Sequence, residues 1–414
     1  MKLRTLMVLV VVLVILAVVA GVRLRKPAGR AAEGPVPGAA VLAGLDINQV
    51  SKLTVVSGVS TSLVEKKDGR WIVSSLYGYP ADFDRLAQQL RSLVDLKVGQ
   101  IMRGGTDNLD EFGLSASNAT HVLLKDAADK TLADLFIGMP RLAENGQPYG
   151  NGPGGQYLRV GSGPVLLVSD MVRGFSPSGA DWARRELFSV NPREVKTLTL
   201  GSPAGELNIR TTGPGTYTLD GQATNEIVEP PVAGRLFAAL HSLTFVTVAD
   251  PAATNQITGL DKPRRFTAKT TNGFYYSVLT GEADVSQGLF ARVRVEYQPP
   301  APPTTDEVKA SLPPPKDTDA TSNREAQVKQ EFDVRMAAYN KKVTDDQQLA
   351  QDLDASLRKW TYVLSATDCA NLTIDRNQLV KKIEPPTPTQ SVKPPKAPEG
   401  EEPAAETQAT PAEK

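Results

Sequence analysis

The feature that most constrains the fold is a sequence pattern that occurs twice, roughly 145 residues apart, in the same order. Three pairs of segments match: 48–55 with 192–200, 69–73 with 215–219, and 85–93 with 235–243. The third pair, "RLAQQLRSL" and "RLFAALHSL", shares Arg, Ser and three Leu positions. Constant order and spacing favour two copies of one unit over chance similarity.

Each copy combines short stretches of strand periodicity with one amphipathic helix. In the first copy, residues 83–94 carry apolar side chains at helical spacing, and Asp82 is placed to cap the first turn rather than to catalyse. Hairpins are predicted around "DAADK", "GSG" and the Asn-Gly of "TTNGF". The sequence therefore predicts an α+β protein of two similar β-rich lobes, an internal duplication with one principal helix in each lobe.

Composition sets the expected boundaries between the parts of the chain. They are an N-terminal transmembrane anchor at 1–26, a Pro/Gly/Ala linker at 27–44, the first repeat at 45–189, the second repeat at 190–297, a Pro-rich segment with a long helical insertion at 298–357, a closing strand and helix of the second repeat at 358–383, and a tail at 384–414. The tail is expected to be disordered because it has too few apolar residues to fold.

Residues 6–22 form an uninterrupted apolar run, flanked by Arg4 and Arg23. A membrane helix needs about 17 to 25 such residues, so one span is expected. The alternative is a cleaved secretory signal, for which Val18 and Ala20 supply small residues. Either reading places the bulk of the chain outside the cytoplasm, although basic residues on both flanks leave the orientation open.

The insertion contains a long helix, expected at about 322–358, with an approximate heptad seam. The seam consists of Val328, Phe332, Met336, Tyr339, Val343, Ala350, Leu353 and Leu357, and Asp346 interrupts it. Two interpretations stay open: the helix lies across its own lobe, or it forms a coiled coil with a partner or a second copy.

Several classes of function lose support from composition and motifs. The 46 basic and 46 acidic residues cancel, which gives no attraction for nucleic acid. Cys369 is the single cysteine, so no intrachain disulfide and no cysteine cluster for a metal are expected. His121 and His241 have no ligand or acid-base partner at a defined spacing.

Nucleotide and hydrolase motifs are equally weak. "GNGPGG" at 150–155 matches G-x-G-x-x-G, but a strand-like segment follows it, so a hairpin loop is expected. Asp110 and Glu111 in "NLDEFGLS" are interpreted as surface charges beside a turn that ends at Gly113, the counterpart of Gly259. No catalytic, cofactor-binding or metal-binding residue is predicted.

Three aromatic residues are the candidate ligand or partner contacts. Trp71 and Tyr217 occupy matching positions in the two copies, and Trp182 precedes the second copy in "GADWARRELF". The favoured interpretation of Trp182 is a plug between the lobes. The alternative is that these rings are exposed in a shared groove and stack on a glycan.

The order of several motifs resembles an uncharacterised bacterial family, domain of unknown function 4340. The motifs are "DGRWIV", "YPADFDRLAQQLRSL", "DEFGLS", "YLRV", "DWARRELF" and "KWTYVLS", over about 45–297 and 358–383. The insertion at 298–357 departs from the family pattern.

This resemblance implies a membrane-anchored accessory protein of a gliding-motility-type ABC transport system. It supplies no catalytic residues. The expected function is a non-enzymatic, single-pass protein of the cell membrane that binds ABC permease or ATPase subunits or another cell-surface machinery. The alternative is an envelope glycan- or peptidoglycan-binding module.

Overall fold

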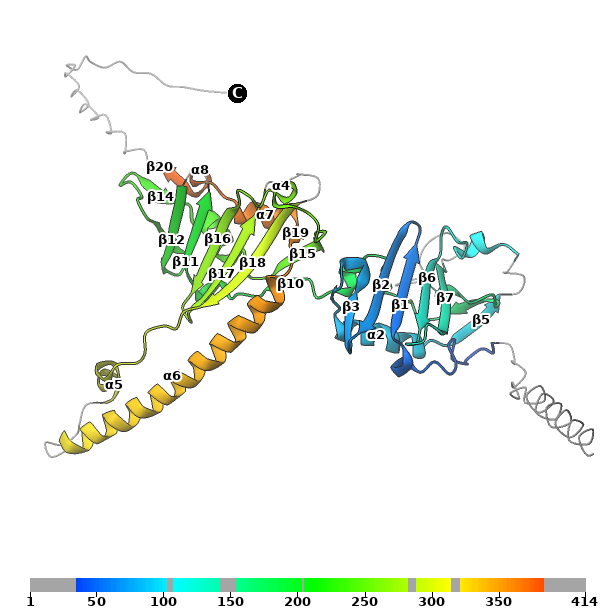
Figure 1. The fold of residues 1–414 in the computed structure, drawn as a ribbon, viewed down its shortest axis with the longest axis horizontal. Helices are drawn as coiled ribbons and strands as arrows, with labels where there is room; N and C mark the ends of the chain where they lie inside the picture. Colours follow the sequence, from blue (N-terminus) through cyan, green and yellow to red (C-terminus); the bar gives the residue numbers. More distant parts are fainter. Residues whose placement is uncertain are drawn as a thin grey trace, which may run out of the picture.

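The computed structural model describes residues 35–102, 107–141, 154–202, 205–281, 288–313 and 321–382. It has two nine-stranded antiparallel sheets, one in each of two lobes, and a small two-stranded sheet (Figure 1). The predicted α+β class is therefore confirmed. The predicted anchor at 6–22 and the tail at 384–414 lie outside the described residues. Among the helices described, none has the length and apolarity that a membrane span requires.

The first lobe is a sheet with the order β4-β3-β2-β1-β6-β7-β8-β9-β5. Its strands are β1 (Lys52–Ser57), β2 (Ser60–Lys67), β3 (Arg70–Val73), β4 (Tyr79–Pro80), β5 (Val98–Met102), β6 (Thr120–Lys125), β7 (Thr131–Pro140), β8 (Gln156–Val160) and β9 (Val165–Val168). Helix α2 (Phe83–Val94) buries Leu86, Leu90 and Leu93 in the same core as alternate strand residues. Asp82 caps α2 as predicted, accepting a hydrogen bond from the Arg85 amide at 3.2 Å.

The second lobe has the order β10-β15-β19-β18-β17-β16-β11-β12-β13. Its strands are β10 (Glu186–Phe188), β11 (Val195–Ser202), β12 (Gly205–Gly213), β13 (Thr216–Leu219), β15 (Leu243–Val248), β16 (Arg264–Thr270), β17 (Phe274–Thr280), β18 (Leu289–Tyr297) and β19 (Tyr362–Leu364). Its helices are α3 (Pro230–Ala238), α4 (Asn255–Thr258), α7 (Ala366–Leu372) and α8 (Arg376–Leu379). The small sheet pairs β14 (Glu226–Val228) with β20 (Val380–Lys382).

The two lobes share one strand order. Read from its far edge, the second sheet runs β13-β12-β11-β16-β17-β18-β19-β15, which corresponds strand for strand to β3-β2-β1-β6-β7-β8-β9-β5. A short 3-10 turn with an Asx cap precedes the first central strand in each lobe: Asp46 accepts from the Asn48 amide and Asn191 from the Arg193 amide. The predicted hairpins form as β6–β7, β8–β9 and β16–β17.

The boundaries of the lobes differ from the predicted domain limits at two points. Residues 38–41, placed in the flexible linker, bond to β5, and the Val98 amide donates to the Ala39 carbonyl at 2.9 Å. Strand β10, placed in the first repeat, pairs with β15 of the second sheet. Each of these segments thus covers an equivalent edge of its own sheet.

A pair of glycines explains the motif "NLDEFGLS". Gly113 ends the 3-10 turn η3 (Leu109–Phe112) with φ of 65°, and Gly259 ends α4 with φ of 68°. Each turn packs on a second glycine: a Cβ at Gly138 would lie 2.3 Å from the Phe112 carbonyl oxygen, and one at Gly281 would lie 1.8 Å from that of Thr258. The motif therefore has a structural role: it forms a tight turn that packs against Gly138. Its carboxylates, on Asp110 and Glu111, are exposed.

An aromatic cluster joins the lobes into one continuous core. The Tyr79 ring of β4 lies 5.2 Å from that of Phe245 in β15 and 5.0 Å from that of Trp360. Phe245 in turn lies 5.3 Å from Tyr362 of β19. Burial raises the pKa of both Tyr79 and Tyr362. The lobes consequently share buried apolar surface in addition to the chain that links them.

The insertion forms an arm on the second lobe. It consists of an extended strap at 298–304, helix α5 (Thr305–Ser311) and the 37-residue helix α6 (Thr321–Leu357). The C-terminal part of α6 lies along β18, and the rest extends away from the sheet beside α5 (Figure 1). The predicted long helix is α6.

Candidate functional site

Trp182, one of the three predicted contact residues, belongs to the core. Its side chain is fully buried, and the indole N–H lies 3.1 Å from the Ser62 hydroxyl and 2.9 Å from the Ser176 carbonyl. It ends the 3-10 turn η4 (Gly179–Trp182), and its own carbonyl accepts from the Asp82 amide. A ligand has no access to this ring.

The other two predicted residues lie far from each other in the fold. Trp71 is half-buried on β3, near the junction of the lobes. Tyr217 is half-buried on β13, the edge strand of the second sheet farthest from β10, and its ring packs 4.9 Å from Phe237. The structure does not bring Trp71, Trp182 and Tyr217 together in one groove.

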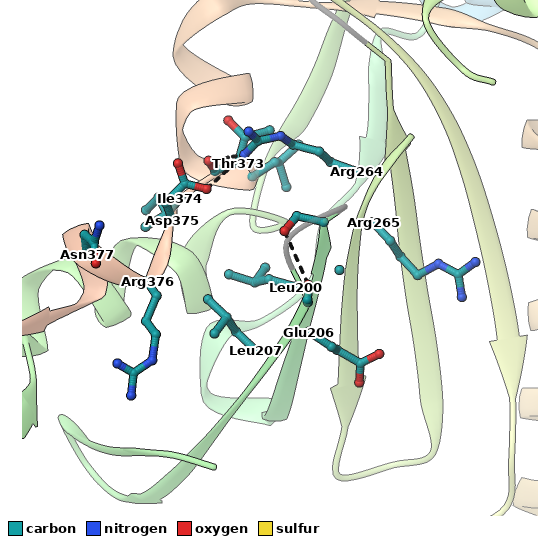
Figure 2. Close-up of a pocket in the computed structure, with 14 residues that line it drawn as sticks. Leu200, Glu206, Leu207, Arg264, Arg265, Thr373, Ile374, Asp375, Arg376 and Asn377 are labelled. Carbon is teal, nitrogen blue, oxygen red and sulfur yellow. Dashed lines mark hydrogen bonds and ion pairs between the residues drawn. The ribbon is translucent and has the colours of Figure 1, made fainter. Parts of the chain in front are cut away.

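A depression of about 610 Å³ lies at one end of the second sheet (Figure 2). Three separate segments form it: the β11–β12 hairpin, the start of β16, and the loop between α7 and α8. Its apolar floor includes Leu200, Leu207, Leu372 and Ile374. Sequence reasoning missed this site because no local motif joins segments so far apart.

Two of the three arginines that line this depression form ion pairs with carboxylates. Arg264 donates to Asp375 at 3.2 Å and to the Thr373 carbonyl at 3.3 Å. Arg376 forms a bidentate pair with Glu226, at 3.1 and 2.8 Å. Figure 2 shows Arg265 directed away from the α7–α8 loop. The arginines 264 and 376 therefore fasten the C-terminal segment to the sheet, and neither offers a free cation to an anionic ligand.

A histidine and an aspartate meet on the outer face of the first sheet. His121 Nε2 lies 2.6 Å from Asp134 Oδ1, and the imidazole stacks on Phe136 at 4.3 Å. The guanidinium of Arg159 covers the same Phe136 ring at 4.7 Å. The expectation that His121 lacks a partner was wrong, because strand pairing brings Asp134 beside it from β7. His241 is exposed.

The residues directly opposite this pair in the strand register do not include the third member that nucleophilic catalysis requires. Val56 and Phe136 flank His121 in the strand register, and Leu123 faces Asp134. None of these three neighbours supplies a nucleophile. Within the described parts of the chain, no group of three His, Cys, Asp or Glu residues is arranged to hold a metal ion. Burial raises the pKa of the Cys369 thiol to about 11, which keeps it protonated.

The arm is the largest part of the fold that belongs to neither nine-stranded sheet. A buried carboxylate on α6 attaches it to β18. Asp354 of α6 is 8% exposed and accepts from Arg294 Nε at 2.7 Å and from the Val295 amide at 3.1 Å. Strand β18 pairs with β19 only at Leu289–Ala291, so Asp354 satisfies an amide on the open edge.

The predicted heptad seam of α6 faces its own chain. Its residues are half-buried or buried, from Val328 to Leu357. Tyr339 donates from its hydroxyl to the Pro300 carbonyl at 2.7 Å, and Arg324 donates to the carbonyls of Pro313 and Lys309. The strap and α5 thus cover the outer part of the seam, while β18 covers its end.

The opposite face of α6 carries what we call the outward stripe, one exposed residue every three to four positions. It consists of Ala326, Gln330, Asp333, Ala337, Lys341, Thr344 and Gln348. Val334, beside the stripe, is 59% exposed. Arg335 pairs with Glu331 and Lys342 with Asp346, whereas Asp333 and Lys341 form no ion pair with any described residue, although Lys329 and Asp345 lie four positions from them.

Comparison with known proteins places the central part of the chain in a family. Residues 71–263 match the sequence model described as Domain of unknown function (DUF4340). This segment belongs to that family. The expected family is thereby confirmed. The search of curated proteins and the search of solved structures gave no match.

The DUF4340 segment crosses the boundary between the lobes. It begins in β3 and ends just before β16, so it includes α2, the glycine-ended turns at Gly113 and Gly259, and Trp182. The arm lies beyond the matched DUF4340 residues. A role of the arm therefore has to be argued from this chain alone.

Proposed function

We propose that the chain is a non-enzymatic, membrane-anchored extracytoplasmic protein that binds partners in an ABC-type transport or cell-surface machinery. In this proposal residues 6–22 are the anchor and the arm is the assembly element. The observation that carries the proposal is the arm itself, whose outward stripe is exposed along its whole length.

The cost of ordering the arm supports a binding role. At 1.5 Å per residue α6 is roughly 55 Å long, and only its C-terminal part is needed to cover β18. Polar helices are marginal in water without tertiary contacts. The chain nevertheless supplies α5, the strap and the Tyr339–Pro300 bond to keep the outer part extended. An element held out in this way is suited to contact another molecule.

We also propose that the lobes arose by internal duplication. The shared strand order, the Asx-capped turns and the paired glycines support this reading. In a duplicated pair, the arm is the main element that one lobe has and the other lacks, which makes it the part with a separate role.

The glycan-binding alternative has less support. It needs an aromatic groove, yet Trp182 is buried and Trp71 and Tyr217 lie on distant strands. It remains as an outcome of the experiment.

Affinity capture of the full chain from its native membranes tests the proposal. Enrichment of permease and ATPase subunits is the expected result. Enrichment of cell-wall fragments without these subunits would instead favour the glycan-binding alternative, and loss of the chain from the membrane fraction would remove the anchor from the proposal.

A variant with a shortened arm tests the role of the arm directly. Because the Tyr339 hydroxyl bonds to the Pro300 carbonyl, a short glycine link can replace residues 302–337 and leave the β18 contacts in place. The variant should keep its thermal unfolding midpoint and lose the transport subunits. Unchanged capture by this variant would show that another surface binds them.

A further inference from the structure

We propose that two copies of the chain pair through the outward stripe of α6, with the helices antiparallel about a two-fold axis beside Ala337. In this inference the arm binds a second copy of the same chain. The inference rests on the proposed assembly role of the arm. It leaves both lobes of each copy free for other subunits.

The stripe is symmetric about Ala337 in position and complementary in charge. In an antiparallel pair, Asp333 of one copy faces Lys341 of the other, and the reverse contact repeats across the axis. A parallel pair would place Asp333 on Asp333 and Lys341 on Lys341. Charge therefore selects the antiparallel arrangement.

The same two charges cannot neutralise each other within one helix. Asp333 and Lys341 lie more than two turns apart, roughly 12 Å along the axis at 1.5 Å per residue. Side chains three or four positions apart do pair on this helix, as Arg335 does with Glu331. An unpaired acid and an unpaired base on one stripe gain partners when a second copy adds its own stripe.

The side chains of the stripe permit close approach. Ala337 lies on the axis, so no bulky group separates the helices there, and Ala326 near one end faces Gln348 of the other copy. Packed helices lie about 8 to 10 Å apart, and small residues allow the lower value. Gln330 and Thr344 face each other and add a polar contact. The interface is modest, so tethering both copies to one membrane would raise its occupancy through effective concentration.

Cysteine cross-linking of the full chain, in mild detergent and in vesicles, tests this geometry. Ala337→Cys brings two identical thiols together on the axis, within disulfide reach. Ala338→Cys is the matched control, because it is the next exposed alanine and points about 100° away around the helix. The native Cys369 is buried and stays as background. Ala337→Cys should cross-link at least tenfold more than Ala338→Cys.

Charge reversal provides the second test. Lys341→Asp and Asp333→Lys, each made in the Ala337→Cys background, should reduce the cross-link at least tenfold because like charges then face each other. The double variant restores complementarity and should restore the cross-link. Equal cross-linking of Ala337→Cys and Ala338→Cys, or no recovery in the double variant, would overturn the inference.

The two proposals fail separately. A chain that captures permease and ATPase subunits but does not cross-link at position 337 keeps the proposed function and loses the pairing. A chain that cross-links as expected and captures no transport subunit keeps the pairing and loses the transport role.

Discussion

The two lobes have one strand order but differ in how neighbouring strands are joined. In the first lobe, β8 and β9 are consecutive strands of a hairpin and pair from Gln156–Val168 to Arg159–Val165. In the second, the arm separates the equivalent strands β18 and β19, which pair only at Leu289–Ala291. The hairpin turn is where a long insertion is tolerated, and the insertion must then cover the strand edge that it opens.

The principal helices of the two lobes, α2 and α3, also differ in the interactions that stabilise their N-terminal turns. Helix α2 has a side-chain cap from Asp82. Helix α3 starts with Pro230 and Pro231 and has no side-chain cap, while the Glu229 amide bonds to the Leu379 carbonyl of α8. The first lobe thus fixes its helix locally, and the second fixes it through the C-terminal segment.

The largest expected effect comes from the fully buried Trp182 of the core. Trp182→Ala should lower the free energy of unfolding by about 4 kcal/mol, because it empties a fully buried site and removes two indole hydrogen bonds. Urea unfolding followed by tyrosine fluorescence and far-ultraviolet circular dichroism measures the loss. Trp71→Ala, at a half-buried position, is the control and should lose about half as much. Equal losses would contradict the separate roles of the two rings.

The paired glycines test whether the lobes are equivalent in detail. Gly281→Ala should cost about 3 kcal/mol and Gly138→Ala about 2 kcal/mol, because each new methyl group meets a backbone carbonyl. Gly201→Ala is the control: its nearest neighbour, the Arg265 Cβ, lies at 3.5 Å, so the change should stay within about 0.5 kcal/mol. Thermal unfolding of the three variants gives the ranking. A neutral Gly138→Ala would break the equivalence of the two turns.

Much of the fold was predictable because local rules set it. Strand alternation, the Asp82 cap and the glycine that ends a helical turn each depend on a few adjacent residues. These patterns therefore predicted the α+β class, which the two antiparallel sheets confirm. The heptad pattern likewise located α6, although its periodicity alone could not show that the strap and β18 cover the seam.

The side-chain clusters were not predictable, since their partners are distant in sequence. Asp134 reaches His121 through strand register, and Asp354 reaches Arg294 from across the whole arm. The depression in Figure 2 needs three segments and the Arg264–Asp375 pair. Only the tertiary fold determines such contacts.

Removing Asp354 tests how the second lobe protects its open edge. Asp354→Ala should cost about 2 kcal/mol, less than for a fully buried ion pair because the Arg294 side chain is 47% exposed. Hydrogen exchange at the Val295 amide should rise at the same time. Asp352→Ala removes an exposed contact with Gln348 and should cost about 0.3 kcal/mol. Unchanged exchange at Val295 in Asp354→Ala would show that packing of α6 alone seals the edge.

The same carboxylate predicts a pH dependence. Burial alone would raise the pKa of Asp354, but hydrogen bonds from Arg294 and the Val295 amide outweigh it and hold the pKa below its usual value. A lowered carboxyl pKa stabilises the fold above the unfolded-state pKa of about 3.9, and this stability is lost as pH falls through the native pKa. The stability difference between wild type and Asp354→Ala should therefore be constant from about pH 6 to 8 and shrink below about pH 4. Urea midpoints across this range measure it.

The smallest expected loss of stability tests the difference between the N-terminal turns of α2 and α3. Asp82→Ala should cost about 1 kcal/mol, because the Arg85 amide loses its acceptor in the first turn of α2. Glu229→Ala at the matching position of α3 should stay within about 0.5 kcal/mol, since no side-chain cap exists there to lose. Hydrogen exchange of the first-turn amides distinguishes local fraying from global unfolding. If both variants lost the same stability, tertiary packing would fix both helices, and the contrast between a locally fixed first lobe and a second lobe held by its C-terminal segment would no longer stand.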